Sequence, residues 1–212
     1  MKKILALILS AIMTGVSGIP ALAEKEEIVQ DTVAGTSPSM DIDVKSAILL
    51  EKSTGTVLFE VNADEQLPPA SITKIMTLLL VMEAIDDGKL TMETEVTASE
   101  HACSMGGSQI WLEPGEVFTV HELLKASAIA SANDACVALV ETVSGSEEVF
   151  VERMNQRAEE LGMTNTVFKN CTGLDADGHV STARDISLMS AALLRHPAIK
   201  NYSTAWKDRQ RN

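Results

Sequence analysis

The sequence predicts a mixed α/β domain of the α+β class, in which helices outnumber strands. Two short apolar runs, Ala47–Leu50 and Thr56–Val61, flank "KSTG" and predict a β-hairpin with Gly55 in its turn. Residues 75–85 are apolar on nearly every side, which predicts a buried central helix. Because a lone hairpin is only marginally stable in water, its strands require partners. We therefore expect a helical subdomain beside an antiparallel sheet that is incomplete in this chain.

The N-terminus has the pattern of a secretory signal peptide over residues 1–23. Two lysines precede an apolar run, Ile4–Met13, that is too short to span a bilayer, and a small-x-small triplet follows as a cleavage site. Residues 24–44 are polar and lack periodicity, which predicts a flexible leader before a folded domain over 45–212. The protein is therefore expected to be exported to the cell envelope, whether extracytoplasmic or periplasmic.

The chain is strongly acidic, with 17 basic and 30 acidic residues and a net charge of −13 at pH 7. Nucleic acid and anionic membrane surfaces require a basic face, so neither is expected as a partner. The cysteines, Cys103, Cys136 and Cys171, are odd in number and leave at least one free thiol. Cys136 stands in an apolar helical run and is expected to be buried and inert.

The next elements follow from apolar periodicity and from helix start and stop signals. Asp86-Asp87-Gly88 ends the central helix, and residues 89–120 are expected to form loops and short extended pieces. Two apolar helices joined by "SAND" predict a helix-turn-helix over residues 120–145. A further helix is expected over residues 146–161.

The C-terminal part is predicted to contain a loop and one last helix. Residues 165–181 lack periodicity and are expected to be loop. Thr182 and Asp185 predict a capping box for a helix over Ala183–Arg195, which Pro197 would stop.

Ser71 and Lys74 stand at the start of the predicted central helix, in "PPASITKIMT". If Ser71 is the N-cap, Lys74 is the third helical residue, where a structural cap prefers Glu or Gln and where the helix dipole disfavours a cation. Residues at i and i+3 share one helix face, and a lysine kept neutral by burial is able to take a proton from a serine hydroxyl. The pair is a candidate nucleophile and base; the alternative is a cap beside a solvated lysine.

Ser131 and Asn133 form a second candidate pair, in the tight turn between two apolar helices. Both side chains could point into one cleft, with the hydroxyl shuttling a proton and the amide holding a substrate carbonyl. The structural alternative is a capping box made by Ser131 and Asp134.

Three stretches together resemble a known family. "PASITKIMT", "SANDACVALV" and "CTGLDADGHVSTARD" have the order and approximate spacing found in the exported D-alanyl-D-alanine carboxypeptidases, the low-molecular-mass penicillin-binding proteins. The resemblance implies a β-lactamase/transpeptidase-like fold. It also implies removal of the terminal D-alanine from peptidoglycan stem peptides through an acyl-enzyme, inhibition by β-lactam antibiotics, and no cofactor or metal.

Carried over to this sequence, the resemblance implies that Ser71 is the nucleophile and Lys74 its general base, with the Ser71 backbone N–H in the oxyanion hole. Ser131 would relay a proton to the leaving amine, and Asn133 would position the acyl-side substrate chain. A loop that borders the family's site is matched by three residues that we expect to be scaffolding: Asp175, Gly178 and His179.

The sequence also departs from the family. The third motif, Lys-Thr-Gly on a strand facing the nucleophile, does not occur in these 212 residues. That strand supplies a cation and a hydroxyl for the substrate carboxylate. The C-terminal strands, a second β-rich domain and an amphipathic membrane-anchoring helix are not found in this chain either. Residues 45–212 are therefore interpreted as the N-terminal portion of a truncated catalytic domain.

Two alternative functions follow from the same motifs. A serine β-lactamase shares the Ser/Lys helix, but class A enzymes add a Glu-x-x-x-Asn loop, and neither Glu159 nor Glu160 has Asn four residues later. The second alternative is an inactive fragment that at most binds wall peptide or a partner, which the missing Lys-Thr-Gly supports.

Metal-binding patterns are incomplete. "DADG" at residues 175–178 starts like a calcium loop, but the twelfth position is Ile186. "HELLK" at His121 lacks the second histidine of a zinc helix. No metal site is predicted, and the four histidines are expected at the surface or in loops: His101, His121, His179 and His196.

Overall fold

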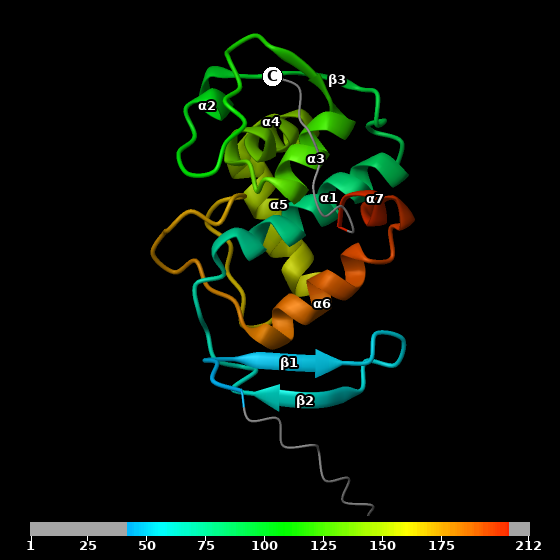
Figure 1. The fold of residues 1–212 in the computed structure, drawn as a ribbon, viewed down its shortest axis with the longest axis vertical. Helices are drawn as coiled ribbons and strands as arrows, with labels where there is room; N and C mark the ends of the chain where they lie inside the picture. Colours follow the sequence, from blue (N-terminus) through cyan, green and yellow to red (C-terminus); the bar gives the residue numbers. More distant parts are fainter. Residues whose placement is uncertain (1–41, 204–212) are drawn as a thin grey trace, which may run out of the picture. The chain divides into compact units, whose positions relative to one another are not determined.

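The computed structural model describes residues 42–203, so the predicted signal peptide and most of the predicted leader lie outside the described residues. No helix within residues 42–203 is both long and apolar enough to cross a membrane. The described helices, with η for 3-10 helices, and strands follow one another in this order (Figure 1): β1 (Ala47–Leu50), β2 (Val57–Val61), η1 (Ala70–Thr73), α1 (Lys74–Asp86), β3 (Glu95–Thr97), α2 (Glu100–Cys103), β4 (Val117–Thr119), α3 (Val120–Ile129), α4 (Asn133–Ser144), α5 (Glu147–Glu160), α6 (Ala183–Leu193), η2 (Pro197–Ile199) and α7 (Lys200–Ser203).

The predicted hairpin is confirmed, because β1 and β2 pair antiparallel. Gly55 turns the chain with φ +72°, a conformation that glycine adopts without a Cβ penalty. The Glu51 carboxylate accepts the backbone N–H groups of Ser53 at 3.0 Å and Thr54 at 2.7 Å, which satisfies the other turn amides. One side of the hairpin packs against α6 (Figure 1).

α1 is the buried central helix that the sequence predicts. Every residue from Met76 to Met82 is buried, and the helix packs against α3 and α4 on one side and α6 on the other (Figure 1). The helix ends at Asp86, and Gly88 follows with φ +72°, so the predicted stop is confirmed. Since α1 has no exposed face, its position depends on the packing of all its neighbours.

The start of α1 differs from the prediction. Residues Ala70–Thr73 form a separate 3-10 turn, η1, and α1 begins at Lys74 with Thr73 as an N-cap whose side chain makes no capping bond to the helix. Ala70 has φ +46°, which is unusual for a residue with a side chain. The expectation that Ser71 is the N-cap is therefore wrong, because the tight turn leaves Ser71 exposed in front of the helix.

The predicted helix-turn-helix is present as α3 and α4. A full capping box starts α3, since the Thr119 hydroxyl accepts the Glu122 N–H at 3.2 Å and the Glu122 carboxylate accepts the Thr119 N–H at 2.9 Å. The N-cap of α4 is Ala132, which makes no side-chain bond. The alternative of a capping box made by Ser131 and Asp134 is therefore wrong.

The capping box predicted from Thr182 and Asp185 forms only in part, at the start of α6. The Thr182 hydroxyl accepts the Asp185 N–H at 3.1 Å. The Asp185 carboxylate instead accepts the Asn165 N–H at 2.9 Å and the Thr166 hydroxyl at 2.8 Å. This carboxylate thereby ties α6 to the segment that follows α5.

The helices after residue 145 agree with the prediction except at the last one. The helix predicted over residues 146–161 is α5, with the Ser146 side chain as its N-cap. α6 ends at Leu193, and Pro197 occupies the first turn of η2, which leads into α7. The helix over Ala183–Arg195 is therefore not the last one, because proline is as suitable for starting a helical turn as for stopping a helix.

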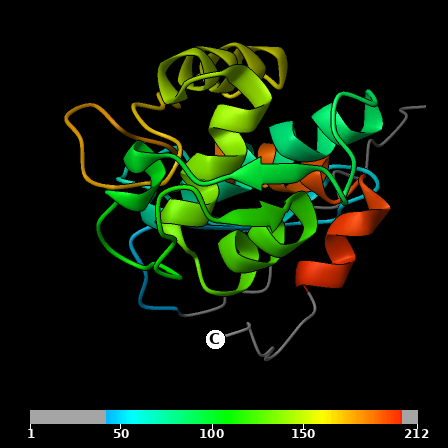
Figure 2. The ribbon, with the colours of Figure 1, turned by 90° about the horizontal axis from the view of Figure 1, so that it is seen from above.

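β3 and β4 form a second antiparallel pair, with Val96 opposite Phe118, and lie side by side in Figure 2. The sequence predicts only short extended pieces here, because three-residue strands are too short to show alternation. Among the described residues the two pairs remain separate sheets, so the mixed α/β class with an incomplete antiparallel sheet is confirmed.

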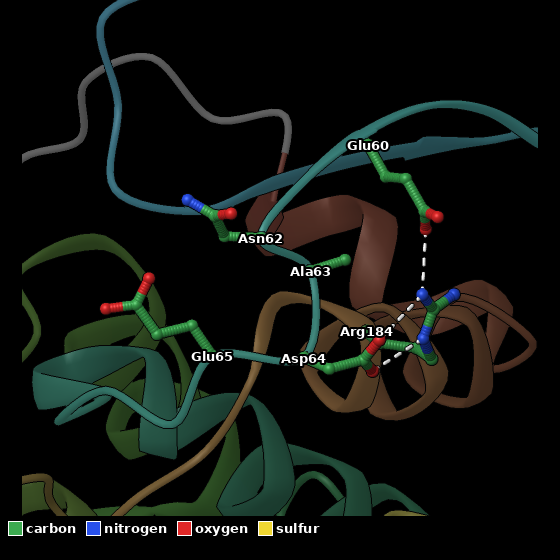
Figure 3. Close-up of a pocket in the computed structure, with 6 residues that line it drawn as sticks. All are labelled: Glu60, Asn62, Ala63, Asp64, Glu65 and Arg184. Carbon is green, nitrogen blue, oxygen red and sulfur yellow. Dashed lines mark hydrogen bonds and ion pairs between the residues drawn. The ribbon is translucent and has the colours of Figure 1, made fainter.

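Arg184, near the start of α6, links this helix to the end of the hairpin. Its guanidinium pairs with the Asp64 carboxylate at 2.7 Å and with the Glu60 carboxylate at 2.8 Å across a surface pocket (Figure 3). Glu65 also lines this pocket but points away from the guanidinium (Figure 3). The arginine side chain is 36% exposed, so solvent screens both pairs and they add little to stability. The pocket contains none of the predicted site residues.

The central position of α1 predicts where shortening a side chain lowers the stability of the fold most. Leu79 is fully buried, so Leu79→Ala should lower the free energy of unfolding by about 2–5 kcal/mol. Leu58 in β2 is 47% exposed, and the same substitution there should change it by about 0.5 kcal/mol or less. Chemical denaturation measures both, and equal losses would contradict the central role of α1.

Candidate active site

Ser71 and Lys74 meet in front of α1. Ser71 lies in η1 and is exposed, whereas Lys74, the first residue of α1, is only 3% exposed. Lys74 Nζ lies 3.5 Å from Ser71 Oγ, at the long end of hydrogen-bond distances. The fold thus brings the predicted nucleophile and the predicted base together.

The Lys74 amine has two closer partners. Nζ donates to Asn133 Oδ1 at 2.6 Å and to the Thr172 carbonyl at 2.8 Å, and both oxygens only accept. A neutral amine has two hydrogens and one lone pair. With both hydrogens given to these acceptors, the lone pair is left for the hydroxyl of Ser71. The arrangement is therefore suited to removing a proton from that hydroxyl.

The surroundings of Lys74 favour the neutral amine. Burial lowers the pKa of Lys74 below its ordinary value of 10.5, while the nearby Cys136 and Cys171 thiols act in the opposite direction. The positive end of the α1 dipole also disfavours an ammonium at this position. Both cysteines are buried and unpaired, as expected for Cys136.

Asn133 is fixed by contacts on both sides of its amide. It is 5% exposed, and its Nδ2 donates to the Gly106 carbonyl at 2.7 Å, which leaves Oδ1 for Lys74. Its backbone N–H donates to the Ser108 carbonyl at 2.7 Å. The residue predicted to bind substrate thus also holds the amine of the predicted base.

Ser131 stands two residues before Asn133 in a strained backbone conformation, with φ +54°. Its hydroxyl is buried and has no hydrogen-bond partner within the part of the chain that the structure describes. It is therefore not bonded to Ser71 or Lys74. A buried hydroxyl without a partner is uncommon and is a feature of sites that bind a ligand or water.

Asp134 is a structural residue of the site that the sequence analysis considered only as a cap. It is 1% exposed, and its carboxylate accepts the N–H groups of Ile110 and Leu112, both at 3.1 Å, and of Ala135 at 2.8 Å. These bonds fix the segment that precedes β4 against the start of α4. The feature of the sequence that indicates this role is an aspartate within an otherwise apolar helical run.

The Thr172 carbonyl is the acceptor that the sequence could not reveal. It belongs to the loop between α5 and α6, which carries the stretch "CTGLDADGHVSTARD", and a backbone oxygen has no signature in the sequence. Asp175 and Gly178 of the same loop are exposed.

His179 lies in a loop, within the expectation for the histidines, but it is buried there at 4% exposure. Its Nδ1 accepts the Lys169 N–H at 3.2 Å, and its Nε2 lies 2.8 Å from the Thr73 hydroxyl. Since Nδ1 is an acceptor, the proton is on Nε2, which donates to Thr73. The ring thereby supports the residue that precedes Lys74.

Solved structures with this fold define its class. The D-alanyl-D-alanine carboxypeptidase DacD from Francisella tularensis aligns with a TM-score of 0.76 and 33% identity, over 77% of this chain and 40% of that one. Penicillin-Binding Protein D2 from Listeria monocytogenes, in its ampicillin-bound form, aligns with a TM-score of 0.70 and 30% identity, over 79% and 69% of the two chains. The chain therefore has the fold of the penicillin-binding proteins, as the resemblance implied.

The family follows from the sequence comparisons. A family model for D-alanyl-D-alanine carboxypeptidase matches residues 31–212. The chain is 48% identical to the D-alanyl-D-alanine carboxypeptidase DacF of Bacillus subtilis (strain 168) over 208 residues, which cover 98% of this chain and 52% of DacF. This chain belongs to the D-alanyl-D-alanine carboxypeptidase family. It spans about half the length of the curated relatives it matches.

The buried state of His179 predicts a specific dependence of stability on pH. Burial and the charge of Lys169 lower the pKa of His179 below 6.5, its ordinary value in an unfolded chain. The unfolded chain therefore binds the extra proton first, and stability should fall as the pH falls below 6.5, by up to about 1.4 kcal/mol per pH unit.

The measurement is the free energy of unfolding against pH for the wild type and for His179→Gln. The variant should be less stable at every pH but should lack this part of the slope below pH 6.5. The other histidines are common to both proteins, so their contributions cancel. Parallel curves would show that His179 does not cause the dependence.

Proposed function

We propose that the protein acts as a serine-type D-alanyl-D-alanine carboxypeptidase, which removes the terminal D-alanine from peptidoglycan stem peptides through an acyl-enzyme. The observation that carries the proposal is the geometry of Lys74, whose two hydrogens have acceptors and whose lone pair is left for Ser71. Membership of the family supports the class of substrate. The proposal requires no metal or cofactor.

In the first step Ser71 Oγ attacks the carbonyl carbon between the two D-alanines while Lys74 takes the hydroxyl proton. The backbone N–H of Ser71 is one donor to the resulting oxyanion, next to the positive end of α1. The C–N bond then breaks, the leaving D-alanine amine receives a proton, and an ester joins the peptide to Ser71. Water cleaves this ester, and the shortened peptide leaves with a new carboxylate.

Ser131 and Asn133 are assigned complementary roles. The unpartnered hydroxyl of Ser131 is available to pass a proton to the leaving amine, and the strained backbone at this residue is typical of functional sites. Asn133 positions the acyl-side substrate chain while its Oδ1 keeps the Lys74 amine in place. The loop of Asp175, Gly178 and His179 is scaffolding.

The same chemistry makes β-lactam antibiotics the expected inhibitors, because a β-lactam presents a reactive amide to Ser71 in place of the terminal dipeptide. The Listeria relative is known in ampicillin- and cefotaxime-bound forms. Peptidoglycan lies outside the cytoplasm, so the proposal includes export by the signal peptide predicted over residues 1–23. A nucleic-acid partner is not part of it.

The same observations bear on the two alternative functions. Curated relatives such as DacF of Bacillus subtilis are carboxypeptidases, so the serine β-lactamase is not favoured. The first step at which an inactive fragment differs from the proposal is the acylation of Ser71, on which the later steps depend. Acylation therefore decides between the proposal and that alternative.

The decisive experiment is labelling of the 212-residue chain with a fluorescent penicillin, followed by mass spectrometry of the peptides. We expect one adduct on Ser71, and no label in Ser71→Ala. Lys74→Gln should slow labelling by at least about 100-fold, because a general base contributes that much or more. Ser104, an exposed serine bonded to the His101 carbonyl, provides the control: Ser104→Ala should label like the wild type. A wild-type chain that acquires no label supports the inactive fragment.

The lowered pKa of Lys74 also predicts the pH dependence of acylation. Only the neutral amine accepts the proton, so the rate constant should rise with pH and reach half its maximum at the Lys74 pKa, below 10.5. Stopped-flow measurement of labelling from about pH 6 to pH 10 tests this, with Lys74→Gln as the control that should lack the rise. A midpoint at the pKa of an ordinary surface lysine would contradict the role of burial.

A further inference from the structure

Three consecutive residues of the loop between α5 and α6 contact the start of α1. The Cys171 carbonyl accepts the Thr77 hydroxyl at 2.7 Å, and the Thr172 carbonyl accepts Lys74 Nζ at 2.8 Å. Gly173, the next residue, packs against the peptide that joins Ala70 to the nucleophile. Residues 171–173 thus run along the first turn of α1 with their backbone facing it.

The contact at Gly173 leaves no room for a side chain. A Cβ at this position would overlap the Ala70 carbonyl and lie 2.9 Å from Ser71 N. Gly173 itself has φ +87°, and Ala70 has φ +46°, so two residues with left-handed backbone meet here. The strained turn before Ser71 is therefore held by direct backbone packing.

Asn170 gives this loop its shape. Its Oδ1 accepts the N–H groups of Gly173 at 2.7 Å and Thr172 at 3.2 Å, and its Nδ2 donates to the Leu174 carbonyl at 2.7 Å. These are local bonds of the kind by which asparagine builds a turn. They orient the Thr172 carbonyl towards Lys74 and the Gly173 Cα towards Ala70.

From these contacts we propose that Gly173 and Asn170 are positioning residues for the Ser71–Lys74 pair. Gly173 allows the loop to approach the Ala70–Ser71 peptide, and Asn170 holds the loop so that the Thr172 carbonyl meets the Lys74 amine. Their importance for catalysis rests on the proposed function. Their effect on the position of the Lys74 amine does not depend on that function. Small displacements of a positioned group lower reaction rates strongly, so both residues act through the pair without touching substrate.

The loop itself provides a matched control. Gly178 has φ +75°, close to that of Gly173, and the nearest atom to an added Cβ is Lys169 Cε at 3.5 Å, an ordinary contact. Gly173→Ala and Gly178→Ala therefore impose the same backbone strain. Only the first pushes the loop away from Ala70.

The experiment measures the Lys74 pKa directly, by NMR titration of the lysine side-chain carbon next to the amine, with Lys74→Arg assigning the signal. In Gly173→Ala the loop should lift and admit water, so the Lys74 pKa should rise towards 10.5, by about one unit or more. In Gly178→Ala it should equal the wild-type value. Equal Lys74 pKa values in the two folded variants would overturn the proposal.

Asn170 supplies a second pair of variants, which decides the question if Gly173→Ala does not fold. Asn170→Ala removes the acceptor of the two N–H groups and should raise the Lys74 pKa. Asn170→Ser keeps a hydroxyl acceptor suited to the same turn and should restore the value at least in part. An unchanged pKa in Asn170→Ala would count against the proposal.

Labelling with fluorescent penicillin separates this proposal from the proposed function. If the wild-type chain is labelled, Gly173→Ala should slow labelling by at least about 10-fold, and Gly178→Ala should label at the wild-type rate. If it is not labelled, the proposed function fails, while the comparison of Lys74 pKa values still tests the positioning roles.

Discussion

The buried amine of Lys74 is the group on which the arrangement of the site depends. At 3% exposure it requires oxygen partners, because an unpaired amine inside a protein is strongly unfavourable. Those partners come from two distant parts of the chain, Asn133 at the start of α4 and Thr172 in the loop before α6. Apolar packing brings these segments close to α1. The two hydrogen bonds decide the direction of the amine and leave Ser71 as its third neighbour.

Two of the four described non-glycine residues with positive φ stand close in sequence to the partners of this amine. Ala70, with φ +46°, directly precedes Ser71, and Ser131, with φ +54°, stands two residues before Asn133. Left-handed conformations at such residues cost about 1–2 kcal/mol each and persist only where surrounding contacts hold them. The packing of Gly173 supplies such contacts at Ala70. The all-round burial of α1 supplies stability that offsets the strain.

Helix starts show how tertiary contacts compete with local ones. Thr119 and Glu122 form the full capping box that their spacing indicates, whereas the carboxylates of Asp134 and Asp185 bind backbone N–H groups of other segments. These two aspartates are 1% and 2% exposed. A buried carboxylate needs several donors, and an N-cap amide supplies only one, so distant loops provide the rest.

Local patterns in the sequence were enough to predict the hairpin, the buried central helix, the helix-turn-helix and the family, because each depends on periodicity or spacing within a short window. Contacts between distant segments are needed to explain why α1 starts at Lys74, why His179 is buried against Thr73, and why the Thr172 carbonyl holds the amine. The sequence does not reveal such contacts, because a backbone carbonyl that accepts a hydrogen bond has no signature in the sequence. The partner of a buried polar group is chosen by packing between segments far apart in the chain, which no short window of sequence contains.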